Sequence, residues 1–163
     1  MKRLFSFPDP VNEVAARTVA AFVVVMAVAV IVGLRWVLFP LAFGFVARVL
    51  TGPTLSPLGQ LATRIIVPHL PFAERPTAGP PKRFAQGMGA TMAVAALLAQ
   101  FAFDAAGVAT VLAGMIVVAA TLESAFGYCL GCKVFGLLMR AGVIPEDVCD
   151  ACNDISRRNL TPA

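Results

Sequence analysis

The chain contains four cysteines, and they form two pairs near its C-terminal end. Two residues lie within each pair, and the segment 133–148 separates the pairs. This spacing is typical of a metal site with four thiolate ligands, most often for zinc. The predicted ligands are Cys129, Cys132, Cys149 and Cys152, and the predicted cofactor is Zn²⁺.

The same cysteines have a second interpretation as two thiol–disulfide couples. A Cys-x-x-Cys pair near the N-terminus of a helix stabilises the thiolate, which is the nucleophile of disulfide exchange. Two couples could pass electrons or sulfur between a thioredoxin-like partner and the membrane. An iron–sulfur cluster is a third interpretation, because four thiolates also suit it, and inert buried cysteines are a fourth. Because these four interpretations remain open, the sequence does not decide whether the protein is an enzyme.

The composition indicates an integral membrane protein with an all-α fold. Hydrophobic residues make up 59% of the chain and charged residues 13%, whereas a soluble domain carries about a quarter charged residues. Its 163 residues predict a single membrane domain, 1–163. The net charge of +4 does not indicate nucleic acid as a partner, because the basic residues lie where membrane topology places them.

Four apolar segments predict four transmembrane helices, since about 20 apolar residues cross a hydrocarbon core of about 30 Å. The second segment is short and contains Pro40 and Gly44, yet we expect it to span, because the distribution of charge requires it. The four predicted spans are about 15–34, 36–50, 87–103 and 108–126. We expect Asp9 to cap the first of these helices, with Pro10 as its first residue.

The proline-rich segment 51–86 predicts an interfacial middle loop that holds a short amphipathic helix over about 58–70. Within it, 78–81 is expected to break helical structure. The segment 127–163 is the predicted four-cysteine tail. There we expect a knuckle-like turn at 129–133, a helix over 134–140, and a last helix that carries Cys149 and Cys152.

Lysines and arginines favour one orientation of the four spans. They gather in the N-terminal segment, the middle loop and the tail, whereas the two remaining connections carry only Arg35. The positive-inside rule therefore predicts that both termini and the cysteines face the cytoplasm, where stable disulfides are rare.

Three charged residues outside the tail are candidate functional residues. Glu123 lies in the last turns of the fourth predicted span, and an ionisable residue there is either an ion-pair partner of Arg48, Arg83 or another base, or a proton carrier. Lys82 and Arg83 are candidate contacts for an anion or a lipid headgroup. The chain shows no Ser/His/Asp arrangement and no phosphate-binding glycine loop, so a hydrolase or ATPase has little support.

Five short motifs carry a resemblance to a known family. They are 7–13 (FPDPVNE), 52–57 (GPTLSP), 80–86 (PPKRFAQ), 127–132 (GYCLGC) and 145–152 (PEDVCDAC). Together they resemble the bacterial integral-membrane family catalogued as domain of unknown function 4395. The resemblance implies a small multi-span protein of the bacterial cytoplasmic membrane, with gene neighbourhoods shared with thioredoxin-like and sulfur-transfer proteins.

The leading functional prediction is a membrane scaffold or accessory subunit with a cytosol-facing, zinc-type site. The metal would order a tail that is too short to bury its own core. The alternative is a membrane thiol–disulfide or sulfur-relay protein. Expected partners are the lipid bilayer and a thioredoxin-like or other membrane-complex protein, and small residues in each span allow homo-oligomers. A third prediction, a small-solute channel or transporter, has support only from Glu123 and the short second span.

Overall fold

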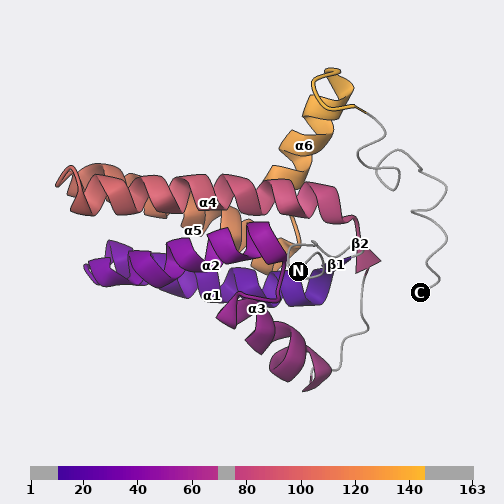
Figure 1. Cartoon of the computed structure of the whole chain (residues 1–163), viewed down its shortest axis with the longest axis horizontal. Coiled ribbons are helices and arrows are strands. Elements are labelled where there is room, and N and C mark those ends of the chain that lie inside the picture. Colours follow the sequence, from indigo (N-terminus) through magenta and orange to yellow (C-terminus); the bar gives the residue numbers. More distant parts are fainter. Residues whose placement is uncertain (1–10, 70–75, 146–163) are drawn as a thin grey trace.

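Four helices lie side by side and antiparallel in the computed structural model of the chain (Figure 1), which describes residues 11–69 and 76–145. The all-α prediction is confirmed for these residues, apart from one pair of two-residue strands. The four helices are α1 (Glu13–Ile31), α2 (Leu38–Thr51), α4 (Gly79–Phe101) and α5 (Ala106–Phe126).

Helix α1 begins at Glu13, because the Asn12 side chain accepts a hydrogen bond from the N–H of Val14 at 2.9 Å. Asn12 is therefore the N-cap, and the cap expected at Asp9 lies outside the described residues. Strand β1 (Val11–Asn12) pairs antiparallel with strand β2 (Pro76–Thr77). This pairing ties the start of α1 to the start of α4.

Three of the four helices are long and apolar enough to cross a membrane, and α2 is not. Helix α2 has 14 residues, about 21 Å at 1.5 Å per residue, against a core of about 30 Å. The prediction of four membrane-length helices is therefore wrong for the segment 36–50. The reason is local: Gly33 adopts φ +116° after α1, and the next residues form a 3₁₀ turn, η1 (Arg35–Val37).

Helix α4 starts eight residues earlier than the predicted span. Two prolines occupy its first turn, where their missing N–H groups have no intrahelical partner to lose. The segment 78–81, expected to break helical structure, therefore initiates a helix. As a result, Lys82 and Arg83 lie on a transmembrane-length helix and not in a loop.

The middle segment forms a short helical rod that projects from the bundle (Figure 1). It consists of α3 (Pro57–Gln60), a π-helical turn η2 (Leu61–Ile66) and a 3₁₀ turn η3 (Val67–His69). The Ser56 hydroxyl caps α3 by accepting a bond from the N–H of Gly59 at 3.2 Å. The predicted short helix in this region is confirmed, and its place at a membrane interface stays a prediction.

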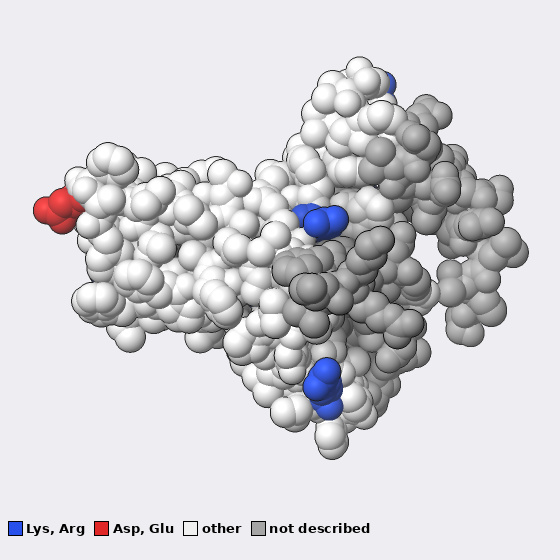
Figure 2. Space-filling model, in the orientation of Figure 1, with Lys and Arg blue, Asp and Glu red and all other residues white. Residues whose placement is uncertain are grey.

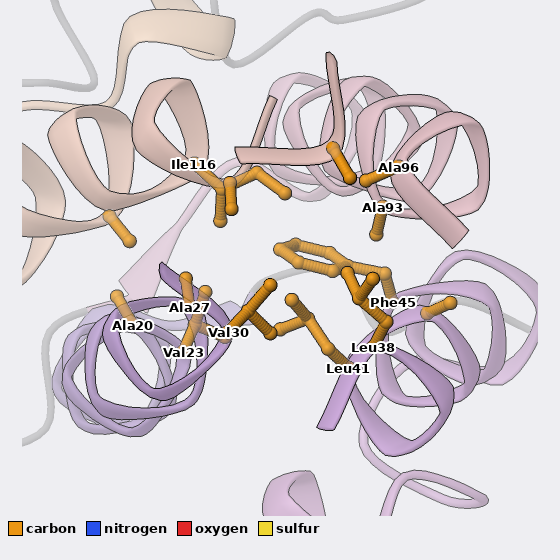
Figure 3. Close-up of a cluster of buried hydrophobic side chains, with 14 of the residues drawn as sticks. Ala20, Val23, Ala27, Val30, Leu38, Leu41, Phe45, Ala93, Ala96 and Ile116 are labelled. Atoms are coloured by element: carbon orange, nitrogen blue, oxygen red, sulfur yellow. The ribbon is translucent and has the colours of Figure 1, made fainter. Parts of the chain in front are cut away.

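Small side chains bring the helices together in the core (Figure 3). Alanines of α4 face the larger apolar side chains of α2, and the Phe45 ring lies between these two helices. At Gly89 of α4, an added Cβ would lie 2.3 Å from the Phe45 ring. The outer faces are also apolar, as at Val25, Val111 and Val118, which are 59–67% exposed.

This close approach predicts opposite effects for two glycines of α4. Gly89→Ala places a methyl group against Phe45, and overpacking of this kind costs about 1–3 kcal/mol. Gly87→Ala meets open space and should stabilise the helix by up to about 1 kcal/mol. Thermal unfolding of the two purified variants measures the difference, and equal unfolding temperatures would contradict this packing.

Candidate functional site

Charged side chains gather at one end of the bundle, where α2 and α5 end and α4 begins. Figure 2 shows a surface that is almost free of charge along the bundle, with basic atoms near one end and acidic atoms at the opposite extreme. At the basic end, three charged side chains turn into the protein: Arg48 and Lys82 are buried, and Glu123 is nearly so. The site is built around them.

Lys82 and Glu123 form an ion pair, with 2.6 Å between Nζ and Oε1. Their side chains are 7% and 16% exposed. Because α4 and α5 are antiparallel, the first turn of α4 lies beside the last turn of α5, which brings these two residues together. Glu123 therefore has a basic partner, which agrees with the ion-pair role, one of the two roles predicted for it. Removing one member of such a buried pair generally costs about 3–5 kcal/mol.

Arg48 is buried on α2, where its hydrogen-bond partners are neutral and the Glu123 carboxylate is near enough to interact with its charge. Its Nε donates to Gln86 Oε1 at 2.9 Å, its Nη1 donates to Ser56 Oγ at 3.3 Å, and its guanidinium lies 4.7 Å from the centre of the Phe45 ring. From the sequence, Arg48 is expected only as a topology signal and a candidate partner of Glu123. The missed signal is its position one helical turn after Gly44, which leaves room for its side chain to fold inward.

Arg17 holds the end of α5, where the chain turns toward the cysteines. Its guanidinium donates to the carbonyl oxygens of Ser124 and Ala125 over 2.9–3.2 Å. These carbonyls belong to the last turn of the helix, where a cation is favoured by the helix dipole. Gly127 then ends α5 with φ +67°, a left-handed conformation that glycine adopts without steric cost.

Cys129 and Cys132 lie at the start of helix α6 (Leu130–Arg140) and not in the knuckle-like turn expected for 129–133. Cys129 is the N-cap: its Sγ accepts a hydrogen bond from the backbone N–H of Cys132 at 3.3 Å. The helix therefore begins four residues earlier than predicted. This arrangement satisfies one of the free N–H groups of the first turn.

Gly131, between the two cysteines, allows α6 to rest directly on α4. An added Cβ at Gly131 would lie 2.5 Å from the Cα and Cβ atoms of Ala85. Gly131 lies within α6 and has no positive φ, so close approach and not a turn explains this glycine. The contact between Gly131 and Ala85 holds Cys129 at the charged end of the bundle.

The two thiols have opposite acidities. The pKa of Cys129 is lowered, first by a hydrogen bond from the Cys132 thiol and further by the Lys82 ammonium and the N–H of Cys132. Burial and the Glu123 carboxylate act against this shift. The pKa of Cys132 is raised, because its thiol donates to Cys129 and is itself desolvated. Such an asymmetric pair has one thiol suited to attack and one that keeps its proton.

A cavity of about 180 Å³ lies inside the charged end of the bundle. Its polar lining consists of Arg48, Gln86, Glu123 and Cys129, and the rest is mainly apolar. A second cavity of about 190 Å³ shares Arg48 and Gln86 and also contacts Lys82.

Only half of the predicted metal site falls within the described residues. Cys149 and Cys152 lie outside them, and within 11–69 and 76–145 no group of three or more His, Cys, Asp or Glu side chains could hold a metal ion. The zinc site therefore stays a prediction. Arg83, the other candidate anion contact, donates from Nε to the carbonyl oxygen of Val49 at 3.1 Å.

The thiol asymmetry predicts different pH profiles for alkylation. In a Cys149→Ser/Cys152→Ser background, the alkylation midpoint of Cys129 should lie below the ordinary cysteine value of about 8.5, and that of Cys132 above it. Mass spectrometry of the two sites measures alkylation as a function of pH. The midpoints are compared and not the absolute alkylation rates, because burial slows those rates. Cys132→Ala removes the donating thiol and should raise the Cys129 midpoint. A shared midpoint for both cysteines would contradict this geometry.

Residues 11–140 match the family described as "Domain of unknown function (DUF4395)", and the chain belongs to it. The matched region includes Cys129 and Cys132 and ends before Cys149. No curated protein and no solved structure matches the chain.

Proposed function

We propose that this member of the DUF4395 family is a membrane thiol–disulfide protein whose reactive couple is Cys129 and Cys132. The observation that supports this most is the position of Cys129: it caps α6, accepts the N–H of Cys132 and is influenced by the charge of Lys82. Cysteines at helix N-termini and near cations are the reactive ones.

The reaction is a disulfide exchange with a partner of the thioredoxin-like class. The Cys129 thiolate attacks one sulfur of the partner's disulfide, so a mixed disulfide forms and the other partner sulfur leaves as a thiolate. Cys132 then loses its proton and attacks Cys129 Sγ, which releases the second partner sulfur. The two protons end on the partner, so this protein is oxidised and the partner is reduced. Disulfide exchange is reversible, so the same steps in reverse let a reduced partner convert the Cys129–Cys132 disulfide back to the dithiol.

The Lys82–Glu123 pair tunes this couple without adding net charge. The Lys82 ammonium favours the Cys129 thiolate, and the Glu123 carboxylate opposes it more strongly. Because the two charges cancel at a distance, the site remains tolerable within an apolar bundle. Glu123 therefore has a positioning role, since it holds Lys82 near the thiols.

We further propose that the bundle lies in the bacterial cytoplasmic membrane, where α1, α4 and α5 cross it and the shorter α2 packs against α4. Together α2 and η1 reach about 27 Å, close to the core thickness of about 30 Å. At the end opposite the cysteines, the rings of Trp36, Phe39 and Phe101 pack together with centroids 5.0–5.8 Å apart. Tryptophan is enriched at membrane–water interfaces, so this cluster supports an interface there.

The basic end then faces the cytoplasm by the positive-inside rule. Arg17, Arg48, Lys82 and Arg83 lie on this side, whereas Arg35 and Asp104 lie on the other. A membrane-impermeant maleimide applied to intact cells should leave Cys129 and Cys132 unlabelled. Labelling of either cysteine from outside would reverse the orientation.

A four-thiolate metal site in a scaffold subunit is the second candidate. The close approach of Cys129 and Cys132 at one helix start also suits two ligands of one Zn²⁺ ion. Cys149 and Cys152 would complete it, and the ion would then fix the tail to the bundle. In that case the thiols would resist exchange while the metal is bound.

Trapping of the mixed disulfide tests the dithiol function. In the Cys149→Ser/Cys152→Ser background, adding Cys132→Ser removes the resolving thiol, so oxidised glutathione should leave one stable glutathione on Cys129. The matched variant Cys129→Ser should accumulate far less adduct on Cys132, whose pKa is raised. Intact-mass and peptide mass spectrometry measure both adducts. Equal modification of the two cysteines, or none of either, would contradict the dithiol function.

A further inference from the structure

The cavity beside Cys129 has the size of a single-ring molecule. Its volume is about 180 Å³, and an engineered apolar cavity of about 150 Å³ is enough to bind benzene. Small side chains create this space: Ala16 and Ala20 of α1, Ala85 and Gly89 of α4, and Ala119 and Ala120 of α5 all line it. Phe45 and Arg48 of α2 complete the lining, so α1, α2, α4 and α5 all contribute to the walls.

The rim of the cavity is built from long apolar side chains of α4 and α5. Met88 and Met92 of α4 are partly buried, and Met115 of α5 is 53% exposed. If the bundle lies in a bilayer, this exposed rim contacts lipid chains. A ligand can therefore enter from the membrane, and flexible methionine side chains adapt to its shape.

The inner end of the cavity offers hydrogen-bond donors and a reactive sulfur. Arg48 and Gln86 line the cavity with guanidinium and amide N–H groups, together with Cys129. Two of the Arg48 nitrogens also donate to Gln86 Oε1 and Ser56 Oγ. The Glu123 carboxylate lines the same end, where it is paired with Lys82. A ligand that matches this site has a flat apolar ring, acceptor oxygens at the ring edge and a reactive carbon that a thiolate can attack. It also needs an apolar tail for the methionine rim.

We propose that this cavity binds the ring of a lipid-soluble quinone, which takes up the electrons of the Cys129–Cys132 dithiol. The proposal rests on the proposed function, since it names the membrane-side reactant of the same cysteine pair. A quinone has the required flat ring, two acceptor carbonyls and an isoprenoid tail. A fatty acyl chain would fill the apolar walls but would make no use of the polar wall that Arg48, Gln86 and Glu123 form.

The electron transfer balances in two steps. The Cys129 thiolate bonds to a ring carbon of the quinone, and one quinone oxygen takes up a proton. Cys132 then loses its proton and attacks Cys129 Sγ, so the S–S bond forms as the S–C bond breaks. The electron pair of the S–C bond stays on the ring, and the second oxygen takes up the second proton. Two thiols and one quinone thus give one disulfide and one quinol.

The experiment uses the full chain in lipid nanodiscs with decyl-ubiquinone as the probe. The reduced protein should convert one quinone to quinol per disulfide formed between Cys129 and Cys132, followed by absorbance and by thiol mass spectrometry. Ala119→Phe, which fills the cavity, should lose quinone reduction and keep disulfide exchange with oxidised glutathione. Val118→Phe is the matched control on the outer face of α5 and should keep both activities.

Each outcome bears on one of the two proposals. Glutathione exchange without quinone reduction in the unmodified protein overturns the quinone site and leaves the dithiol function standing, whereas loss of both overturns the dithiol function as well. Quinone reduction that persists in Ala119→Phe overturns this cavity as the site. If Ala119→Phe does not fold, an azido-quinone decides: crosslinks to Met88, Met92 or Met115 support the proposal, and crosslinks confined to other regions overturn it.

Discussion

A buried ion pair between Lys82 and Glu123 is the constraint on which the rest of this structure depends. In an apolar bundle, burying either charge without its partner is costly in free energy. The first turn of α4 must therefore lie beside the last turn of α5, where Lys82 Nζ and Glu123 Oε1 are 2.6 Å apart. That requirement fixes the relative height of the two helices. It also concentrates polar groups at one end, since Arg48 and Gln86 lie against the same cavity as Glu123.

The cysteines follow from this constraint through two glycines. Gly127 ends α5 in a left-handed turn, a few residues after Glu123, and Gly131 lets α6 approach Ala85 of α4, a few residues after Lys82. Cys129 lies between these glycines and is therefore held beside the ion pair. This position supports the proposed dithiol function, because the Cys129 thiol caps a helix beside a cavity. Of the two charges beside it, Lys82 favours the thiolate and Glu123 opposes it.

The sequence predicted the parts of the fold that depend on long apolar runs and failed where local geometry decides. Helices α1 and α5 follow from their composition, and the Cys129–Cys132 pair follows from spacing. The early start of α4 was missed, because Pro80 and Pro81 read as a breaker although they suit a first helical turn. The inward turn of Arg48 and Lys82 was also missed, since burial of a cation depends on partners from other helices, and no pattern within one helix shows them.

The central claim is that Cys129 and Cys132 cycle between dithiol and disulfide. Anaerobic purification without added metal, followed by bound metal and free thiols measured on the same sample, tests it most directly. The account predicts little bound metal and two thiols that disappear on mild oxidation as a Cys129–Cys132 disulfide and return with a thioredoxin-type reductant. One tightly bound zinc ion per chain, with all four thiols resistant to oxidation, would contradict it.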